Sequence, residues 1–135
     1  METNMNKNYF LAIAQYEDEK KQYFFDNIIS KRNKEYCKLH NLEYLEITSG
    51  VYPIRGSILW YKLFKQEEIV KEILNYGDGL IFLDADALLV KKDTNLLPPN
   101  GKSLAYAIDT GNTHCSGFFS INKTDWILKF FENAN

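Results

Sequence analysis

The chain has 135 residues, of which 45% are hydrophobic, 15% are aromatic and 25% are charged. This length and composition predict one globular domain, residues 1–135, rather than a disordered segment. The formal net charge is −2 at pH 7, and the lysines and arginines are spread along the chain. Nucleic acid is therefore not an expected partner, because no basic surface is indicated.

The sequence shows no targeting or membrane-spanning segment. The first residues, METNMNKN, lack a basic stretch followed by an apolar one, so no signal peptide is expected. No apolar stretch approaches the roughly 20 residues of a membrane span. The two cysteines, Cys37 and Cys115, are too few for a disulfide framework and are expected to be free thiols. These features predict a cytoplasmic protein without a membrane span.

The first third of the chain predicts a strand, a helix and a second strand. Residues 9–16 form an apolar run without charges, which is typical of a strand buried on both faces. Residues 17–40 are predicted to form a helix with acidic residues in its first turn. Spacings of three, four and seven place five apolar residues on one face of that helix: Phe25, Ile28, Ile29, Tyr36 and Leu39. Residues 42–47 follow as the second strand.

The middle of the chain predicts a loop, a long helix and a very apolar strand. Residues 51–56 contain proline and glycine and are expected to be a loop. Ser57 is expected to cap a helix that continues to about Asn75. The apolar face of this helix is expected to contain Leu59, Leu63, Val70, Ile73 and Leu74. Residues 80–83 then form the most apolar strand of the chain, which ends in the triplet Asp84-Ala85-Asp86.

Two further strands, residues 104–108 and 117–121, and a helix over residues 124–132 complete the pattern. Strands alternate with helices in the first two thirds of the chain. This alternation predicts a three-layer α/β domain, with a mainly parallel sheet and helices on both faces.

The triplet Asp84-Ala85-Asp86 is the most informative feature of the sequence. Carboxylates in so apolar a setting are costly to bury unless a cation or hydrogen bonds compensate them. In an extended backbone, Asp84 and Asp86 project to the same side and can share one ion. They follow a strand at its carboxyl end, where α/β sheets bind ligands, and their oxygens suit Mg²⁺ or Mn²⁺. The alternative is that Asp84 caps a turn and Asp86 is simply exposed.

Three motifs occur in order along the chain: a W-x-K pattern from Trp60 to Lys62, the strand that ends in D-A-D, and the segment Cys115–Trp126, CSGFFSINKTDW. Together they resemble the nucleotide-diphospho-sugar transferases of GT-A fold, in particular the family with galactosyl-, mannosyl- and xylosyltransferase members. The resemblance extends from about Tyr9 to Phe131. It implies metal-dependent transfer of a hexose or pentose from a nucleotide-diphospho-sugar donor to a glycan or lipid-linked acceptor.

The resemblance also implies roles for individual residues around the donor. Asp86 would ligate Mn²⁺ or Mg²⁺ directly, and Asp84 would reach the ribose, or the metal through water. Gln15 and Tyr16 match the region that receives the nucleotide base. Lys62 either faces the nucleotide and its phosphates or is a solvated helix lysine.

A second group of residues would border the sugar. Ser116 and Gly117 match a turn beside the sugar pocket, where glycine permits close approach of the backbone. Asp109 and His114 flank that turn and are further substrate-site candidates. Trp60 is expected to pack in the core. No catalytic nucleophile or base is identified from the sequence.

The end of the chain departs from the family pattern. Such families generally continue with a region that supplies acceptor contacts and another metal ligand, often a histidine. We therefore expect either a truncated fragment or a reduced domain. The last helix contains Trp126, Phe130 and Phe131 within six residues. An uncovered apolar face of this kind predicts self-association into a homo-oligomer.

Two other functions compete with glycosyl transfer. Haloacid-dehalogenase-like phosphatases also have an apolar strand that ends in D-x-D, and they use the first Asp as nucleophile and the second as acid/base beside Mg²⁺. Their motif normally opens the domain and is followed by Gly or Thr, whereas here it comes late and is followed by Ala87. The other alternative is a non-catalytic sugar-nucleotide-binding or interaction module.

Overall fold

The computed structural model describes residues 6–108, 111 and 114–134, and for residues 114–116 it describes the backbone alone. The elements in chain order are the strand β1 (Asn8–Ile13), the helix α1 (Glu19–Phe24), the π-helical turn η1 (Phe25–Ile29), the helix α2 (Ser30–Leu39), the strand β2 (Leu42–Ile47), the helix α3 (Ile58–Glu72), the strands β3 (Gly79–Leu83), β4 (Leu104–Ile108) and β5 (His114–Asn122), and the helix α4 (Asp125–Ala134). In the described residues, no helix is long and apolar enough to cross a membrane.

The strands form one sheet in the order β2-β1-β3-β5-β4. β1 pairs in parallel with both β2 and β3, so that Leu11 lies between Leu45 and Phe82. β5 is antiparallel to both β3 and β4, so the other four strands all point in one direction. The connection from β4 to β5, residues 109–113, is too short for the crossover that a parallel pair needs. The mainly parallel sheet predicted from the sequence is confirmed, with β5 as the exception.

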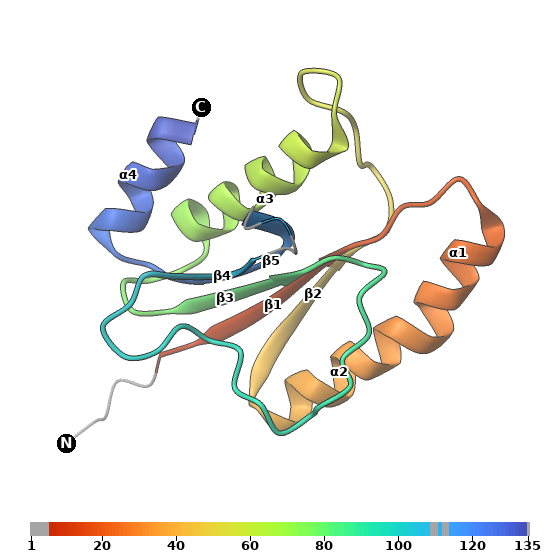
Figure 1. The fold of residues 1–135 in the computed structure, drawn as a ribbon, viewed down its shortest axis with the longest axis horizontal. Helices are drawn as coiled ribbons and strands as arrows, with labels where there is room; N and C mark the ends of the chain where they lie inside the picture. The colour runs from red at the N-terminus through yellow and green to blue at the C-terminus, as the bar shows by residue number, and fades with distance from the viewer. Residues whose placement is uncertain (1–5, 109–110, 112–113, 135) are drawn as a thin grey trace.

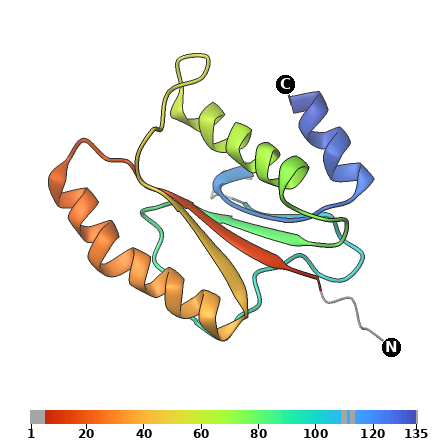
Figure 2. The same ribbon diagram turned by 180° about the vertical axis from the view of Figure 1, so that it is seen from behind.

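Helices cover both faces of the sheet, as predicted. α1, η1 and α2 form one continuous helical segment on one face, and α3 and α4 lie on the other (Figures 1 and 2). Successive residues of β1 point alternately to the two layers. Tyr9, Leu11 and Ile13 pack on the α3 and α4 side, whereas Phe10 and Ala12 pack on the α1 and α2 side.

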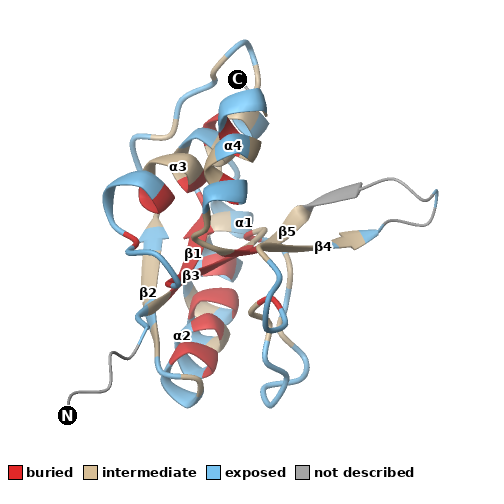
Figure 3. Cartoon of the chain, turned by 90° about the vertical axis from the view of Figure 1, so that its left-hand side faces the viewer, coloured by how far each residue is buried: buried red, intermediate tan, exposed pale blue. Residues whose placement is uncertain are grey.

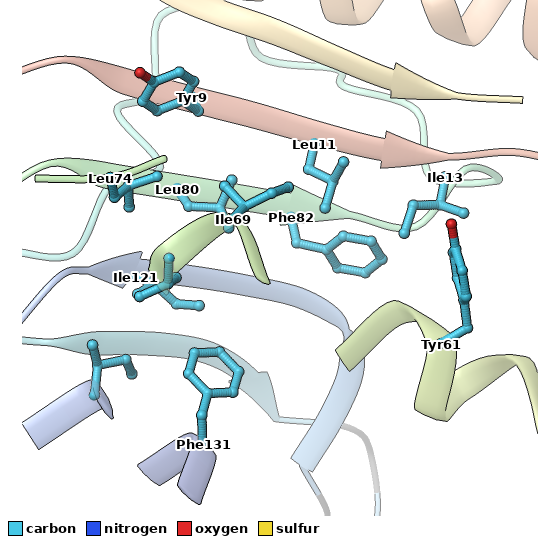
Figure 4. Packing of buried hydrophobic residues seen from close by; sticks show 12 residues of the cluster. Tyr9, Leu11, Ile13, Tyr61, Ile69, Leu74, Leu80, Phe82, Ile121 and Phe131 are labelled. Carbon is cyan, nitrogen blue, oxygen red and sulfur yellow. The ribbon is translucent and has the colours of Figure 1, made fainter. Parts of the chain in front are cut away.

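The larger core lies between the sheet and the helices α3 and α4. Figure 4 shows Leu11, Leu80 and Phe82 of the two central strands on the side from which Ile69 and Phe131 pack. β3 is buried on both faces, because Leu80, Ile81 and Phe82 are all buried (Figure 3). The prediction of a central, buried strand over residues 80–83 is therefore confirmed.

Local capping begins both long helical segments. The side chain of Asp18 accepts hydrogen bonds from the backbone N–H groups of Lys20 and Lys21, which places the N-cap one residue after the predicted start of this helix. Ser57 caps α3 as predicted, because its hydroxyl accepts from the N–H of Leu59. These polar caps satisfy backbone donors that have no partner inside the helix.

The predicted apolar faces of the helices are partly wrong. In the first helical segment Ile28 and Leu39 are exposed, whereas Phe25, Ile29 and Tyr36 are buried. The π-helical turn changes the number of residues per turn there, so a uniform helical period misplaces the residues around it. Leu59 in α3 and Ile73 directly after it are exposed, and the buried residues of this helix are Tyr61, Gln66, Ile69 and Val70.

Candidate functional site

The site lies where the parallel strands β1 and β3 end. Tyr16 follows β1 and Asp84 follows β3, and the two strands are neighbours that point in the same direction. Residues that follow parallel strands meet at one edge of the sheet, which is where open α/β sheets bind ligands. The sheet topology therefore brings together two segments that are about 70 residues apart in sequence.

The triplet Asp84-Ala85-Asp86 forms a tight turn. The N–H of Ala87 donates a 3.1 Å hydrogen bond to the carbonyl of Asp84. The extended backbone expected for the two aspartates is therefore wrong. Ala85 is buried and packs against Ala14 and Phe25, which holds the turn against the α1 and α2 layer. As in the alternative considered from the sequence, Asp84 begins a turn and Asp86 is exposed; exposure at a strand end leaves Asp86 accessible to a ligand.

Lys62 connects α3 with the turn. Its Nζ lies 3.0 Å from Oδ1 of Asp84, and the two side chains are only 24% and 34% exposed. Of the two arrangements open from the sequence, the solvated helix lysine is excluded in this structure. Trp60, the other residue of the W-x-K pattern, is half-buried, and the guanidinium of Arg55 lies 5.0 Å from its ring centre. Trp60 therefore packs beside the loop that precedes α3.

Tyr16 is the aromatic residue of this edge. Burial, and then the negative charges of Asp86 and Asp84, raise the pKa of its hydroxyl above the ordinary value. The phenol is protonated near neutral pH, as tyrosine ordinarily is, and can donate a hydrogen bond. The backbone N–H of Tyr16 donates to Oε1 of Gln22, which fixes the connection between β1 and α1.

The side chain of Gln15 contacts the loop that precedes α3. Its Oε1 accepts a 2.9 Å hydrogen bond from the N–H of Val51. The side-chain oxygen of Gln15 thus ties the end of β1 to the loop that precedes α3. Its next neighbour in sequence, Tyr16, is the one that borders the pocket described below.

A pocket of about 290 Å³ opens beside the turn. It is lined by Tyr16, Lys20, Lys21, Phe24, Phe25, Ala85 and Asp86. Its size is at the lower end of small-molecule sites, and its lining combines aromatic rings with charged groups. Sequence reasoning missed Lys20, Lys21 and Phe24. The available signal was their position in the first helical turns after β1, which the parallel topology places at this edge.

Gly117 contacts the triplet through the backbone. The N–H of Asp84 donates a 2.8 Å hydrogen bond to the carbonyl of Gly117. The resemblance placed Ser116 and Gly117 at a turn, whereas the apolar pattern began a strand at Gly117; in the structure both residues belong to the strand β5. However, the pairing of β5 with β4 is irregular there: Tyr106 pairs with Phe119, and the next residue, Ala107, pairs with Cys115. Residues 116–118 thus form a bulge, a feature that redirects a strand locally.

The remaining substrate-site candidates fall where description is limited. Asp109 lies outside the described residues. His114 and Ser116 belong to β5 by their backbone, and their side chains are outside the described part of the structure.

No family model and no curated protein matches the chain. Among solved structures, the chain is similar to the crystal structure of a glycosyltransferase involved in the glycosylation of the major capsid of PBCV-1. The two are 10% identical and superpose with a TM-score of 0.58 over 93% of this chain and 64% of that one. The chain has a glycosyltransferase-like fold. It spans 64% of the length of that glycosyltransferase structure.

The aspartates fit a divalent cation only together with a second ligand. In the part of the chain that the structure describes, no group of three or more His, Cys, Asp or Glu side chains lies close enough to hold a metal. Asp84 is already paired with Lys62. Mg²⁺ and similar ions are often held by one or two carboxylates while phosphate and water oxygens complete the coordination. Asp84 and Asp86 suit this shared kind of site and do not form a preformed cage.

Proposed function

We propose that this chain is the donor-binding part of a metal-dependent glycosyltransferase. The donor is a nucleotide-diphospho-sugar, and the acceptor of its hexose or pentose is a glycan or a lipid-linked glycan. The observation that carries the proposal is the meeting of Tyr16, Asp84, Asp86 and Lys62 at one sheet edge, beside a pocket. The fold shared with a glycosyltransferase supports it.

Each residue of the edge has a role in this proposal. The pocket beside Tyr16 and Phe24 receives the nucleotide base, while Lys20 and Lys21 contribute positive charge for the phosphates. Tyr16, which keeps its proton, donates a hydrogen bond to the donor. As the sequence resemblance implies, Ser116 and Gly117 would border the sugar, together with His114 and Asp109.

Asp86 and Asp84 would hold Mn²⁺ or Mg²⁺ jointly with the diphosphate. The cation would supply positive charge that stabilises the leaving nucleoside diphosphate. The protein itself orients the donor, and the buried Ala85 keeps the turn in place while it does so. The proposal assigns no nucleophile or base.

Thermal unfolding with UDP, GDP and their sugars, with and without Mn²⁺, tests donor binding. Mn²⁺ and UDP together should raise the melting temperature more than either does alone, because each completes the site of the other. A ligand present at a hundred times its dissociation constant stabilises the folded state by about 2.7 kcal/mol. Asp86→Asn should abolish the synergy, and Asp84→Asn should weaken it less.

Asp93→Asn is the matched control, because Asp93 is an exposed aspartate in the segment that follows the turn. Its melting curves should equal those of the wild type under every condition. If no nucleoside diphosphate changes the wild-type melting temperature in the presence of Mn²⁺, the donor-binding proposal is wrong.

A non-catalytic sugar-nucleotide-binding module is the second candidate function. The pocket beside the turn and the pairing of Asp84 with Lys62 favour it, because both are features of ligand binding that require no transfer step. An assay of sugar release from the bound donor separates the two candidates. Binding without release to water or to any acceptor supports the module, and release supports the enzyme.

A further inference from the structure

The ammonium group of Lys62 pairs with one of the two aspartates, Asp84. Its Nζ is 3.0 Å from Oδ1 of Asp84, and both side chains are partly buried, so the pair is screened less by salt than a surface pair. Asp86, by contrast, is exposed and takes part in none of the ion pairs of the described residues. The two aspartates therefore differ in charge compensation.

The ammonium group of Lys62 neutralises the negative charge of Asp84 that a metal ion would need. A divalent cation that approaches Asp84 meets a positive charge already bound to that carboxylate, and the two cations repel each other. Two more lysines, Lys20 and Lys21, line the pocket beside Asp86 and add positive charge. This charge distribution disfavours a free cation and favours an anion.

A bound diphosphate would remove the repulsion between Lys62 and the cation. Lysine carries a compact charge on a flexible four-carbon stem, so Nζ of Lys62 can turn from Asp84 to a phosphate oxygen while α3 stays in place. Once Lys62 turns away, Asp84 is left with an unpaired negative charge beside Asp86. The cation then gains a second carboxylate as well as the phosphate oxygens.

We infer that Lys62 is an internal counter-ion that makes cation binding depend on the diphosphate. It neutralises Asp84 in the free protein and transfers to the diphosphate when the donor binds. The inference rests on the proposed donor site and adds the order of binding: nucleoside diphosphate first or together with the cation, and not cation first. Lys62 acts through Asp84 and is a positioning residue.

Mn²⁺ binding without any nucleotide tests the inference. The free Mn²⁺ concentration is followed by its electron paramagnetic resonance signal during titration of the protein. Lys62→Met should bind Mn²⁺ more tightly than the wild type, by a factor in the range of about 5–150 that is typical of coupled sites. In the same variant, UDP should increase Mn²⁺ affinity by a smaller factor than it does in the wild type.

Two variants control for charge and for general effects. Lys62→Arg keeps the positive charge and should bind Mn²⁺ about as weakly as the wild type. Lys65→Met is the matched control: Lys65 lies on the same helix, its Nζ is 2.8 Å from Oε1 of Glu68, and its side chain is 22% exposed. It should leave Mn²⁺ affinity unchanged.

Three results would overturn the inference: equal Mn²⁺ affinity of Lys62→Met and the wild type, no Mn²⁺ binding by Lys62→Met at millimolar concentration, or tighter binding by Lys62→Arg as well. If Lys62→Met does not fold, as judged by circular dichroism, Lys62→Gln takes its place with the same expected outcome. Failure of the proposed donor function gives a different signature, because UDP would then bind to no variant while the effect of Lys62 on Mn²⁺ alone persists.

Discussion

Cys37 shows how burial changes the chemistry of a single residue. It lies on α2, packs with Phe10, Tyr36 and Ile81, and is buried. Burial raises the pKa of its thiol to about 12, from an ordinary value of 9.0. Its thiol is free, as the sequence predicted, and the pKa makes it inert rather than reactive.

The raised pKa of Cys37 predicts a loss of stability at alkaline pH. The unfolded chain releases the thiol proton from about pH 9, whereas the folded chain retains it up to about pH 12, so rising pH favours unfolding in that window. The free energy of unfolding should fall by up to about 1.4 kcal/mol per pH unit for this one group. Urea unfolding from pH 7 to pH 11 measures the slope.

Cys37→Ala provides the control for that slope. Burial also raises the pKa of the hydroxyl groups of Tyr16, Tyr36 and Tyr44, so part of the alkaline destabilisation will remain in the variant. In a Cys115→Ser background, native Cys37 should not react with a thiol reagent at pH 8. Rapid reaction of the native protein would contradict the burial of this thiol.

At the scale of elements, α2 holds the segment that follows the Asp84-Ala85-Asp86 turn. This segment, residues 88–97, lies beside α2 in the views from both sides (Figures 1 and 2). The hydroxyl of Tyr36 donates to the carbonyl of Thr94 at 2.7 Å and accepts from the N–H of Leu96 at 3.0 Å. Nε2 of His40 donates to the carbonyl of Lys92 at 2.6 Å, and Lys92 pairs with Glu35.

Tyr36→Phe should destabilise the protein by about 1–3 kcal/mol. The variant keeps the ring in the core but leaves a backbone carbonyl and a backbone N–H of segment 88–97 without their partner. Chemical unfolding measures the difference. Tyr23→Phe is the control, because Tyr23 is exposed on α1 and should change stability by less than about 0.5 kcal/mol. Equal stability of Tyr36→Phe and the wild type would show that water replaces the hydroxyl.

At the scale of the whole molecule, the last helix presents a partly uncovered aromatic face. Trp126 is 55% exposed and stacks on Phe130, with ring centres 5.8 Å apart. Phe131 does not belong to this face, contrary to the expectation, because it is buried in the core with Ile127. The helical period turns Phe131 towards the sheet and Trp126 away from it.

Self-association through α4 remains a prediction. Light scattering of the wild type should give a mass that rises with concentration. The reason is that contact between two copies would remove the apolar surface of Trp126 and Phe130 from water. Trp126→Ser should remain monomeric over the same range. A wild-type mass of one chain at every concentration would refute the prediction that α4 mediates self-association.

Much of the local structure follows from the sequence alone. The strands β2 and β4 begin and end at the predicted residues, and Ser57 caps α3 as predicted. The strand β3 is central and buried as its apolar composition indicated. These features depend on the alternation of side chains and on hydrogen bonds between near neighbours, and such interactions are encoded within a few residues.

Only the tertiary structure decided which groups meet at the site. Lys62 reaches Asp84 from another layer, Gly117 accepts from the N–H of Asp84 across the sheet, and Gln15 turns to Val51. Each contact joins residues that are more than 20 positions apart in sequence. Their meeting depends on which strands become neighbours and on where each helix crosses the sheet. Sequence periodicity shows which face of an element is apolar, but the polar partner of a side chain is set by the packing of separate elements.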